Sequence, residues 1–132
     1  MQNNRRPGLA HGGGLSNRII GLAMRVHSAM GPGLLESAYE KCLAIEFDQE
    51  RLPFARQAPL SIQYNGVHIE PGYVPDFIIA NELVLEIKSV ETILPVHKAQ
   101  LLTYLRLSGC RVGLLINFHT ARLTHGIRRC VL

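Results

Sequence analysis

GYVPDFIIANELVLEIKS, residues 72–89, contains two apolar runs that are separated by Asn81-Glu82. The runs predict two consecutive strands joined by a tight turn. Three charged residues lie inside or beside them: Asp76, Glu86 and Lys88. Strands as apolar as these are expected to be buried, and a buried charge costs several kcal/mol unless it is paired or bound to a metal. This stretch is therefore the candidate functional site around which we expect the chain to fold.

The composition indicates one globular domain that could bind a polyanion. The chain has 132 residues, of which 47% are hydrophobic and 18% are charged, which suits a single domain. The formal net charge of +4 fits nucleic acid as a partner, although many basic proteins bind none. No apolar run is long enough to span a bilayer and no secretory signal is recognisable, so we expect a cytoplasmic protein. The three cysteines form no C-x-x-C pair, which disfavours a disulfide framework or a zinc knuckle.

The first third of the chain predicts a tail and two helices. Residues 1–14 are rich in Gly and Asn and are expected to form a mobile tail, so that the domain spans residues 15–132. Ser16 is predicted to cap a helix that runs to about Met30, because apolar residues recur at helical spacing. Gly31-Pro32-Gly33 ends this helix, and a second one is expected over residues 34–51.

The rest of the chain predicts strands with one intervening helix. Asn65-Gly66 is typical of a two-residue hairpin turn. Pro95 is expected to begin a helix that Gly109 ends. The predicted strands are 54–64, 67–69, 73–80, 83–89, 111–118 and an edge strand within 121–131. This order of elements predicts an α/β fold in which one crossover helix leads into the apolar, central strand 111–118.

The charged residues of the opening stretch suggest a metal site. Glu86 and Lys88 are two apart on one strand, so both side chains point to the same face. The turn at 81–82 could bring Asp76 close to Glu86. Two neighbouring carboxylates repel each other unless a cation lies between them, and hard divalent ions such as Mg²⁺ (or Mn²⁺) prefer oxygen ligands. Such an ion would polarise a phosphodiester and lower the pKa of a bound water, and Lys88 could counter the charge that develops on the phosphate.

A structural explanation of the same residues is also open. Glu86 and Lys88 could form an ion pair, and Asp76 could cap a turn after Pro75. For any one of these residues alone we favour that explanation. The occurrence of all three inside apolar strands favours the metal site.

These residues and two further segments carry recognisable motifs. Pro75-Asp76 followed by Glu86-Ile87-Lys88 resembles the signature of the PD-(D/E)xK nucleases, with the acidic residues on consecutive strands. Residues 100–104, QLLTY, are similar to the Q-x-x-x-Y motif of the RecB-like branch. Residues 33–39, GLLESAY, match the motif of the GxxExxY proteins, a small bacterial family of this superfamily. The resemblance covers residues 15–132.

The resemblance implies a restriction-endonuclease-like core, which is a mixed central β-sheet of four or five strands flanked by helices. It implies that Asp76 and Glu86 are metal ligands, with the carbonyl of Ile87 as a third. Lys88 would be the catalytic lysine, and Glu36 would be an additional acidic residue that reaches the metal directly or through water.

The resemblance also assigns two substrate-positioning residues, Gln100 and Tyr104, which are four apart and share one helix face. Tyr39 is expected to pack under Glu36 or to hydrogen-bond to it. The implied function is Mg²⁺-dependent phosphodiester hydrolysis, with DNA as the expected substrate and a homodimer or a larger DNA-processing complex as the assembly. One alternative is a non-catalytic nucleic-acid-binding or complex-forming module that retains the fold. The residues do not separate DNA from RNA, or endonuclease from exonuclease action.

Overall fold

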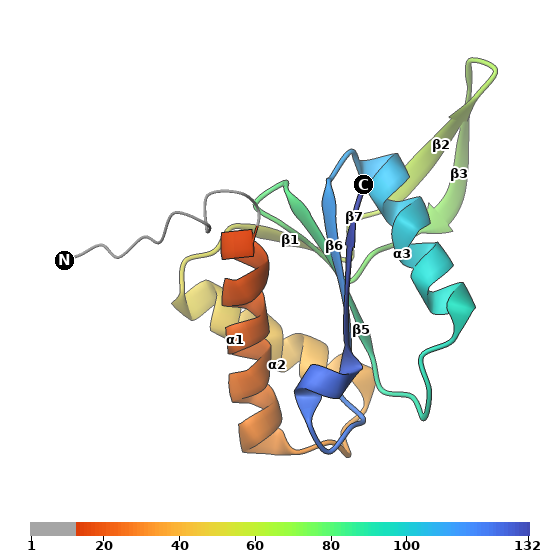
Figure 1. The fold of residues 1–132 in the computed structure, drawn as a ribbon. Helices are drawn as coiled ribbons and strands as arrows, with labels where there is room; N and C mark the ends of the chain where they lie inside the picture. Colours follow the sequence, from red (N-terminus) through yellow and green to blue (C-terminus); the bar gives the residue numbers. More distant parts are fainter. Residues whose placement is uncertain (1–12) are drawn as a thin grey trace.

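The computed structural model describes residues 13–132, and within them two helices precede a sheet with one crossover helix (Figure 1). In chain order the elements are α1 (Gly13–Met30), α2 (Glu36–Gln49), β1 (Phe54–Arg56), β2 (Leu60–Tyr64), β3 (Val67–Tyr73), β4 (Phe77–Ile79), β5 (Leu83–Lys88), α3 (Pro95–Ser108), β6 (Val112–Asn117), the 3-10 helix η2 (Leu123–Gly126) and β7 (Ile127–Val131). The expected α/β class is confirmed.

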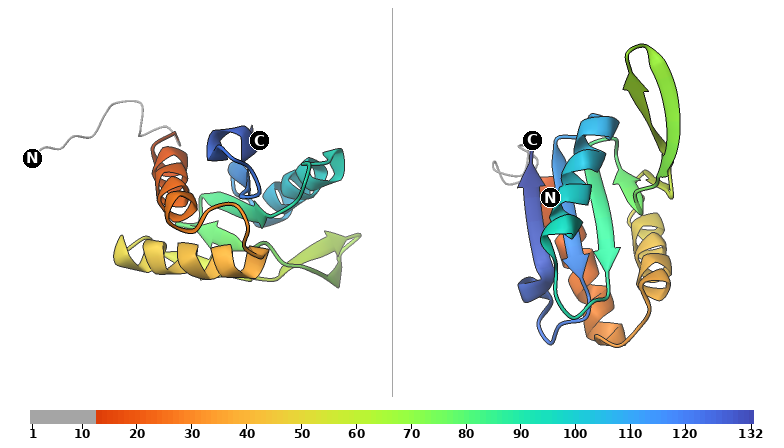
Figure 2. Two further views of the ribbon diagram at one scale, coloured as in Figure 1. Left: turned by 90° about the horizontal axis from the view of Figure 1, so that it is seen from below. Right: turned by 90° about the vertical axis from the view of Figure 1, so that its right-hand side faces the viewer.

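A five-stranded mixed sheet forms the centre of the fold, with the strands in the order β1-β4-β5-β6-β7. β5 and β6 are parallel, and the other neighbouring strands are antiparallel. α3 provides the crossover that a parallel pair requires. β2 and β3 form a separate hairpin, which projects away from the sheet next to α3 (Figures 1 and 2). A mixed sheet flanked by helices is the restriction-endonuclease-like core that the sequence predicts.

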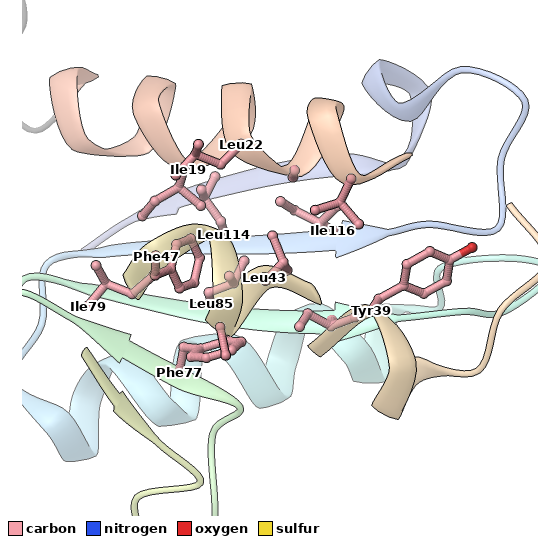
Figure 3. Packing of buried hydrophobic residues seen from close by; sticks show 14 of the residues in the cluster. Ile19, Leu22, Tyr39, Leu43, Phe47, Phe77, Ile79, Leu85, Leu114 and Ile116 are labelled. Carbon is pink, nitrogen blue, oxygen red and sulfur yellow. The ribbon is translucent and has the colours of Figure 1, made fainter. Parts of the chain in front are cut away.

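The helices cover the sheet in two layers (Figure 2). α1 and α2 lie on one face, where Leu43 and Phe47 of α2 pack with Leu85 and Leu114 of the sheet (Figure 3). α3 lies on the other face and shares a second core with Val84 and Leu115. Both layers are needed because successive residues of a strand point to opposite faces.

This alternation along β5 decides where the charged residues lie. Leu83, Leu85 and Ile87 belong to the core beneath α1 and α2. Val84 belongs to the core beneath α3. Glu86 therefore shares the α3 side of the sheet, as the period of two predicts.

The predicted start of the first helix is wrong. Ser16 lies inside α1 and does not cap it, because the helix already includes Gly13 and Gly14. Its hydroxyl accepts a hydrogen bond from Nε of Arg129, at 3.1 Å, and the residue is 1% exposed. The predicted tail, residues 1–14, therefore loses Gly13 and Gly14 to the helix, and its residues 1–12 lie outside the described part of the chain.

The predicted strand 54–64 is two strands that belong to different sheets. Residues 57–59 separate β1 from β2. Gln57 has a left-handed backbone, with φ of 55°, and Pro59 cannot donate to a strand ladder. The strand predicted over 73–80 is also shorter, since Tyr73 ends β3 and β4 comprises only Phe77–Ile79.

The turns, the end of α3 and the last two strands agree with the predictions from the sequence better than the segments above. Asn65 and Gly66 both have positive φ and join β2 to β3. Gly109 has φ of 78° and ends α3, as expected. β6 lies between β5 and β7, and five of its six residues are buried. β7 is the predicted edge strand, although it begins only after η2.

Candidate active site

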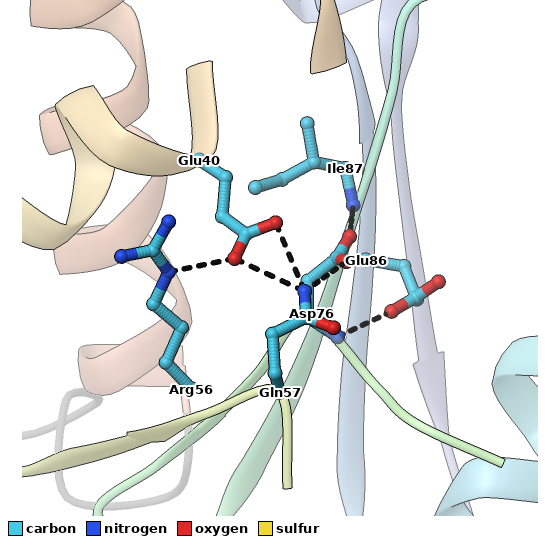
Figure 4. Close-up of polar contacts among 6 residues, drawn as sticks. All are labelled: Glu40, Arg56, Gln57, Asp76, Glu86 and Ile87. Atoms are coloured by element: carbon cyan, nitrogen blue, oxygen red, sulfur yellow. Dashed lines mark hydrogen bonds and ion pairs between the residues drawn. The ribbon is translucent and has the colours of Figure 1, made fainter. Parts of the chain in front are cut away.

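Asp76 and Glu86 face each other across the β4–β5 pair. Asp76 directly precedes β4, and the register pairs Phe77 with Leu85. The Asp76 N–H donates to Oε1 of Glu86 at 2.7 Å, and the Ile87 N–H donates to Oδ2 of Asp76 at 2.8 Å (Figure 4). Each carboxylate is thus held by the backbone of the opposite strand. The expected proximity of the two carboxylates is present in the structure.

Burial makes this pair of carboxylates electrostatically costly. Glu86 is 5% exposed. Its burial, followed by the charge of Asp76, raises the pKa of Glu86 to about 8. Burial also raises the pKa of Asp76 above its ordinary value, with a further contribution from the charge of Glu40. With both carboxylates ionised, the site would therefore carry more negative charge than its surroundings neutralise, which favours the binding of a cation.

Lys88 is the cation nearest to both carboxylates in the sequence. It is half-buried at the end of β5, and its charge lowers the pKa of Asp76 and of Glu86, though by less than burial raises them. Within residues 13–132, no ion pair joins Lys88 to a carboxylate. The structural ion pair between Glu86 and Lys88 that the sequence left open is absent from this structure.

Glu36 lies at the end of β5 that carries Lys88. It is the first residue of α2, and its Oε2 accepts a hydrogen bond from the Ser89 N–H at 3.3 Å. Its charge contributes to the raised pKa of Glu86. The hydroxyl of Ser89 donates to the Leu34 carbonyl at 2.9 Å. The start of α2 is therefore tied to the strand that carries Glu86.

Tyr104 approaches the site from α3, whereas Gln100 makes no hydrogen bond to it among the described residues. Tyr104 is 4% exposed. Burial and the charges of Glu86 and Asp76 raise the pKa of Tyr104 to about 12, although a hydrogen bond with the Val74 backbone opposes the shift. Gln100 is half-buried, one helical turn before Tyr104. The structure thus brings Tyr104 to the acidic pair.

A family model described as the PD-(D/E)XK nuclease superfamily matches residues 14–130. The chain belongs to this superfamily. The match includes Asp76, strands β4 and β5 with Glu86 and Lys88, helices α2 and α3, and α1 from its second residue. A search of curated proteins and a search of solved structures gave no significant match. No helix of the described residues is long and apolar enough to cross a membrane.

The donor atoms of the site fit the hard divalent cation that PD-(D/E)XK nucleases would use. Within residues 13–132, no group of three or more His, Cys, Asp or Glu side chains lies close enough to hold a metal ion. A cation would therefore depend on Asp76, Glu86, backbone oxygen and water. Mg²⁺ commonly uses only one or two carboxylates and retains several waters, and the two carboxylates are buried without full charge compensation. The number of carboxylates and their incomplete charge compensation therefore both fit a divalent ion such as Mg²⁺.

Two residues beside the candidate site, Glu40 and Gln57, were not identified from the sequence. Glu40 is 8% exposed on α2 and accepts a hydrogen bond from Nε of Arg56 at 2.7 Å. Gln57 donates from Nε2 to both carboxylate oxygens of Glu40 and to Asp76. Glu40 follows Glu36 by four residues and so shares its helix face, a signal that could have identified it. No comparable signal exists for Gln57.

The Tyr39 hydroxyl forms its hydrogen bonds with the loop before α2 and not with Glu36, which was one of the two contacts expected for Tyr39. The Tyr39 hydroxyl donates to the Gly31 carbonyl and accepts from the Leu34 N–H at 3.0 Å. Its ring stacks on Phe118, with ring centroids 4.3 Å apart. Tyr39 therefore closes the loop between α1 and α2, and it affects Glu36 only by fixing where α2 begins.

Proposed function

We propose that this protein is a Mg²⁺-dependent nuclease that hydrolyses phosphodiester bonds in DNA. The observation that supports it most is the buried pair of Asp76 and Glu86, in which each carboxylate accepts a hydrogen bond from the opposite strand. Burial and the charge of Asp76 raise the pKa of Glu86, and burial and the charge of Glu40 raise the pKa of Asp76, whereas the charge of Lys88 opposes both shifts only in part. A divalent cation would supply the missing charge.

Asp76, Glu86 and the carbonyl of Ile87 would hold the Mg²⁺ or Mn²⁺ ion, and Glu36 would reach it through water. When bound, the ion would supply Lewis-acid polarisation of the phosphate and acidify water. The buried carboxylates would exclude bulk water from one side of the ion, which strengthens every electrostatic interaction there.

Lys88 would orient the attacking water and stabilise the negative charge that develops on the phosphate during attack. Its position two residues after Glu86 on the same strand supports this role. Tyr104 and Gln100 would position the scissile phosphate or Lys88 from α3. The hydroxyl of Tyr104 remains protonated at neutral pH, since its pKa is raised to about 12, so it can donate a hydrogen bond to a phosphate oxygen.

The finer family assignment belongs to the same proposal. The GxxExxY motif at residues 33–39 and the Q-x-x-x-Y motif at 100–104 support membership of the bacterial GxxExxY proteins and of the RecB-like branch. One nuclease domain over residues 15–132, acting in the cytoplasm as a homodimer or within a larger DNA-processing complex, completes the proposal.

A cleavage assay with matched lysine variants tests the proposed function. Purified protein is incubated with single-stranded DNA, double-stranded DNA and RNA in Mg²⁺, in Mn²⁺ or in EDTA. Cleavage of DNA should require the metal and should fall by about 10²–10³-fold in Lys88→Ala. Lys41→Ala, which removes an exposed lysine from α2, should cleave at the wild-type rate. Equal residual cleavage in the Lys88→Ala protein would indicate a contaminant and refute the proposal.

A further inference from the structure

Glu40 is a buried carboxylate that the proposed chemistry does not use. It is 8% exposed, and it lies on α2, one helical turn beyond Glu36. Arg56 of β1 donates to its Oε2 at 2.7 Å, and this ion pair holds the carboxylate in place. The nearly buried charge is thus satisfied on one side by a strong partner.

Gln57 connects Glu40 to Asp76. Its Nε2 lies 3.0 Å from each carboxylate oxygen of Glu40 and 3.2 Å from Oδ1 of Asp76 (Figure 4). An amide nitrogen carries two hydrogens, so one can point to Glu40 and the other to Asp76. The amide nitrogen of Gln57, and not its oxygen, thus lies between the two carboxyl groups.

The backbone of Gln57 is tied to the same residue as its side chain. The Gln57 N–H donates to the Asp76 carbonyl at 3.0 Å. Gln57 adopts this position with a left-handed φ of 55°, which most residues avoid. Side chain and backbone of one residue therefore both hold Asp76, and the other carboxylate oxygen of Asp76 is held by Ile87.

We propose that Glu40 and Gln57 are positioning residues, which together fix the orientation of the Asp76 carboxylate in the nuclease site. A neutral amide is suited to this role because it orients Asp76 without neutralising it, so the negative charge of Asp76 stays available to a cation. An arginine or lysine in the same place would compete with the ion. This inference rests on the proposed function for its catalytic consequence, but its geometry can be tested without metal.

The first test measures Mn²⁺ binding by calorimetry and DNA cleavage as a function of Mn²⁺ concentration. Gln57→Leu keeps the size of the side chain and removes both donors. It should weaken Mn²⁺ binding by about 10–100-fold, as loss of such outer contacts typically does. The Mn²⁺ concentration for half-maximal cleavage should rise by the same factor, whereas KM for DNA stays unchanged and kcat recovers at saturating Mn²⁺. Gln63→Leu, on the projecting hairpin, is the matched control and should behave as the wild type.

A double variant tests whether Glu40 acts through Gln57. Glu40→Gln should weaken Mn²⁺ binding on its own, but it should add little in the Gln57→Leu background, because coupled residues are not additive. Additive losses would overturn the coupling. Gln57 is exposed, so folding should be preserved; if Gln57→Leu fails to fold, Gln57→Asn tolerates the left-handed backbone and shortens the side chain, with the same expected loss. Wild-type Mn²⁺ affinity in a folded Gln57 variant would overturn the inference.

Nuclear magnetic resonance of the metal-free protein separates this inference from the proposed function. The two Nε2 protons of Gln57 should both be shifted from the positions of a free amide. One should return to the free position in Glu40→Ala and the other in Asp76→Ala. If the wild type neither binds Mn²⁺ nor cuts DNA, the proposed function fails, while these shifts still support the positioning geometry. Free-amide positions in the wild type would overturn the geometry whatever the activity.

Discussion

Replacing Glu86 by Gln should stabilise the metal-free protein, and the gain should grow with pH. Burial, with the charge of Asp76, raises the pKa of Glu86 from 4.5 to about 8. Between these two values the unfolded chain has released the proton that the folded chain still holds. Unfolding therefore becomes more favourable as the pH rises. Gln has no such proton, and its amide oxygen can still accept the hydrogen bond from the Asp76 N–H.

The size of the effect follows from the two pKa values. Each pKa unit corresponds to about 1.4 kcal/mol. Below pH 4.5 the contribution of Glu86 vanishes, because both states hold the proton. At pH 7 the folded protein has lost about 3 kcal/mol through Glu86, and the loss levels off near about 5 kcal/mol above pH 8. For a chain of this length, about 3 kcal/mol corresponds to roughly 10 °C in the melting temperature.

Urea unfolding in EDTA at several pH values between 5 and 8 measures the difference between Glu86→Gln and the wild type. The difference should widen steadily with pH. Glu82→Gln, which makes the same chemical change at an exposed position of the β4–β5 turn, should run parallel to the wild type. Addition of Mn²⁺ should stabilise the wild type and leave Glu86→Gln almost unchanged, since metal binding offsets the repulsion. A stability difference that does not change with pH would refute the argument from burial.

Three further predictions concern the supports of the site. Gly126→Ala would press a Cβ against the Asn117 carbonyl oxygen and should lower the free energy of unfolding in urea by about 2–4 kcal/mol. Gly21→Ala, in open space on α1, should raise the free energy of unfolding by up to about 1 kcal/mol. Equal stabilities of the two variants would contradict the close contact at Gly126. Asn117→Ala removes the side-chain amide that binds both the N–H and the carbonyl of Val90, two residues after Lys88. The backbone that positions Lys88 should then be held less firmly, so kcat should fall. Calorimetry should find an unchanged Mn²⁺ affinity. Tyr104→Phe removes a buried hydroxyl and its hydrogen bond with the Val74 backbone, so the free energy of unfolding should fall by about 1 kcal/mol. An unchanged midpoint of urea unfolding would argue against that bond.

The sequence predicted the part of the site that is local in the chain. Asp76, Glu86 and Lys88 stand out because charges interrupt apolar strands, and a turn between two such strands leaves few ways to pair them. Side chains alternate between the two faces of a strand, so Glu86 lies on the same face as Val84, which packs beneath α3 in the structure. Burial and register are short-range consequences of hydrophobic pattern, which a single sequence carries.

The part that escaped prediction depends on contacts between distant segments. Residues 54–64 alternate well enough to suggest one strand, and nothing in that pattern shows that Gln57 adopts a left-handed backbone. Its conformation is fixed by hydrogen bonds to Asp76 and Glu40, nineteen and seventeen residues away. Tertiary contacts therefore overrode local preference at Gln57. Tyr39 differs, because its hydroxyl binds the nearby Gly31–Leu34 loop, and the sequence pattern does not show the conformation of that loop.

The charges at this end of the sheet connect stability with the proposed function. Asp76 acts on the pKa of Glu86, and Glu40 acts on the pKa of Asp76. The nearby positive charges are those of Arg56, which is paired with Glu40, and Lys88. Backbone N–H groups hold Asp76 and Glu86 in place without neutralising them. Where Glu86 is ionised, near pH 8 and above, the metal-free fold therefore retains a repulsion that a neutral substitution would relieve. A strained site of this kind is expected where function requires it, because a cation that binds there removes the repulsion.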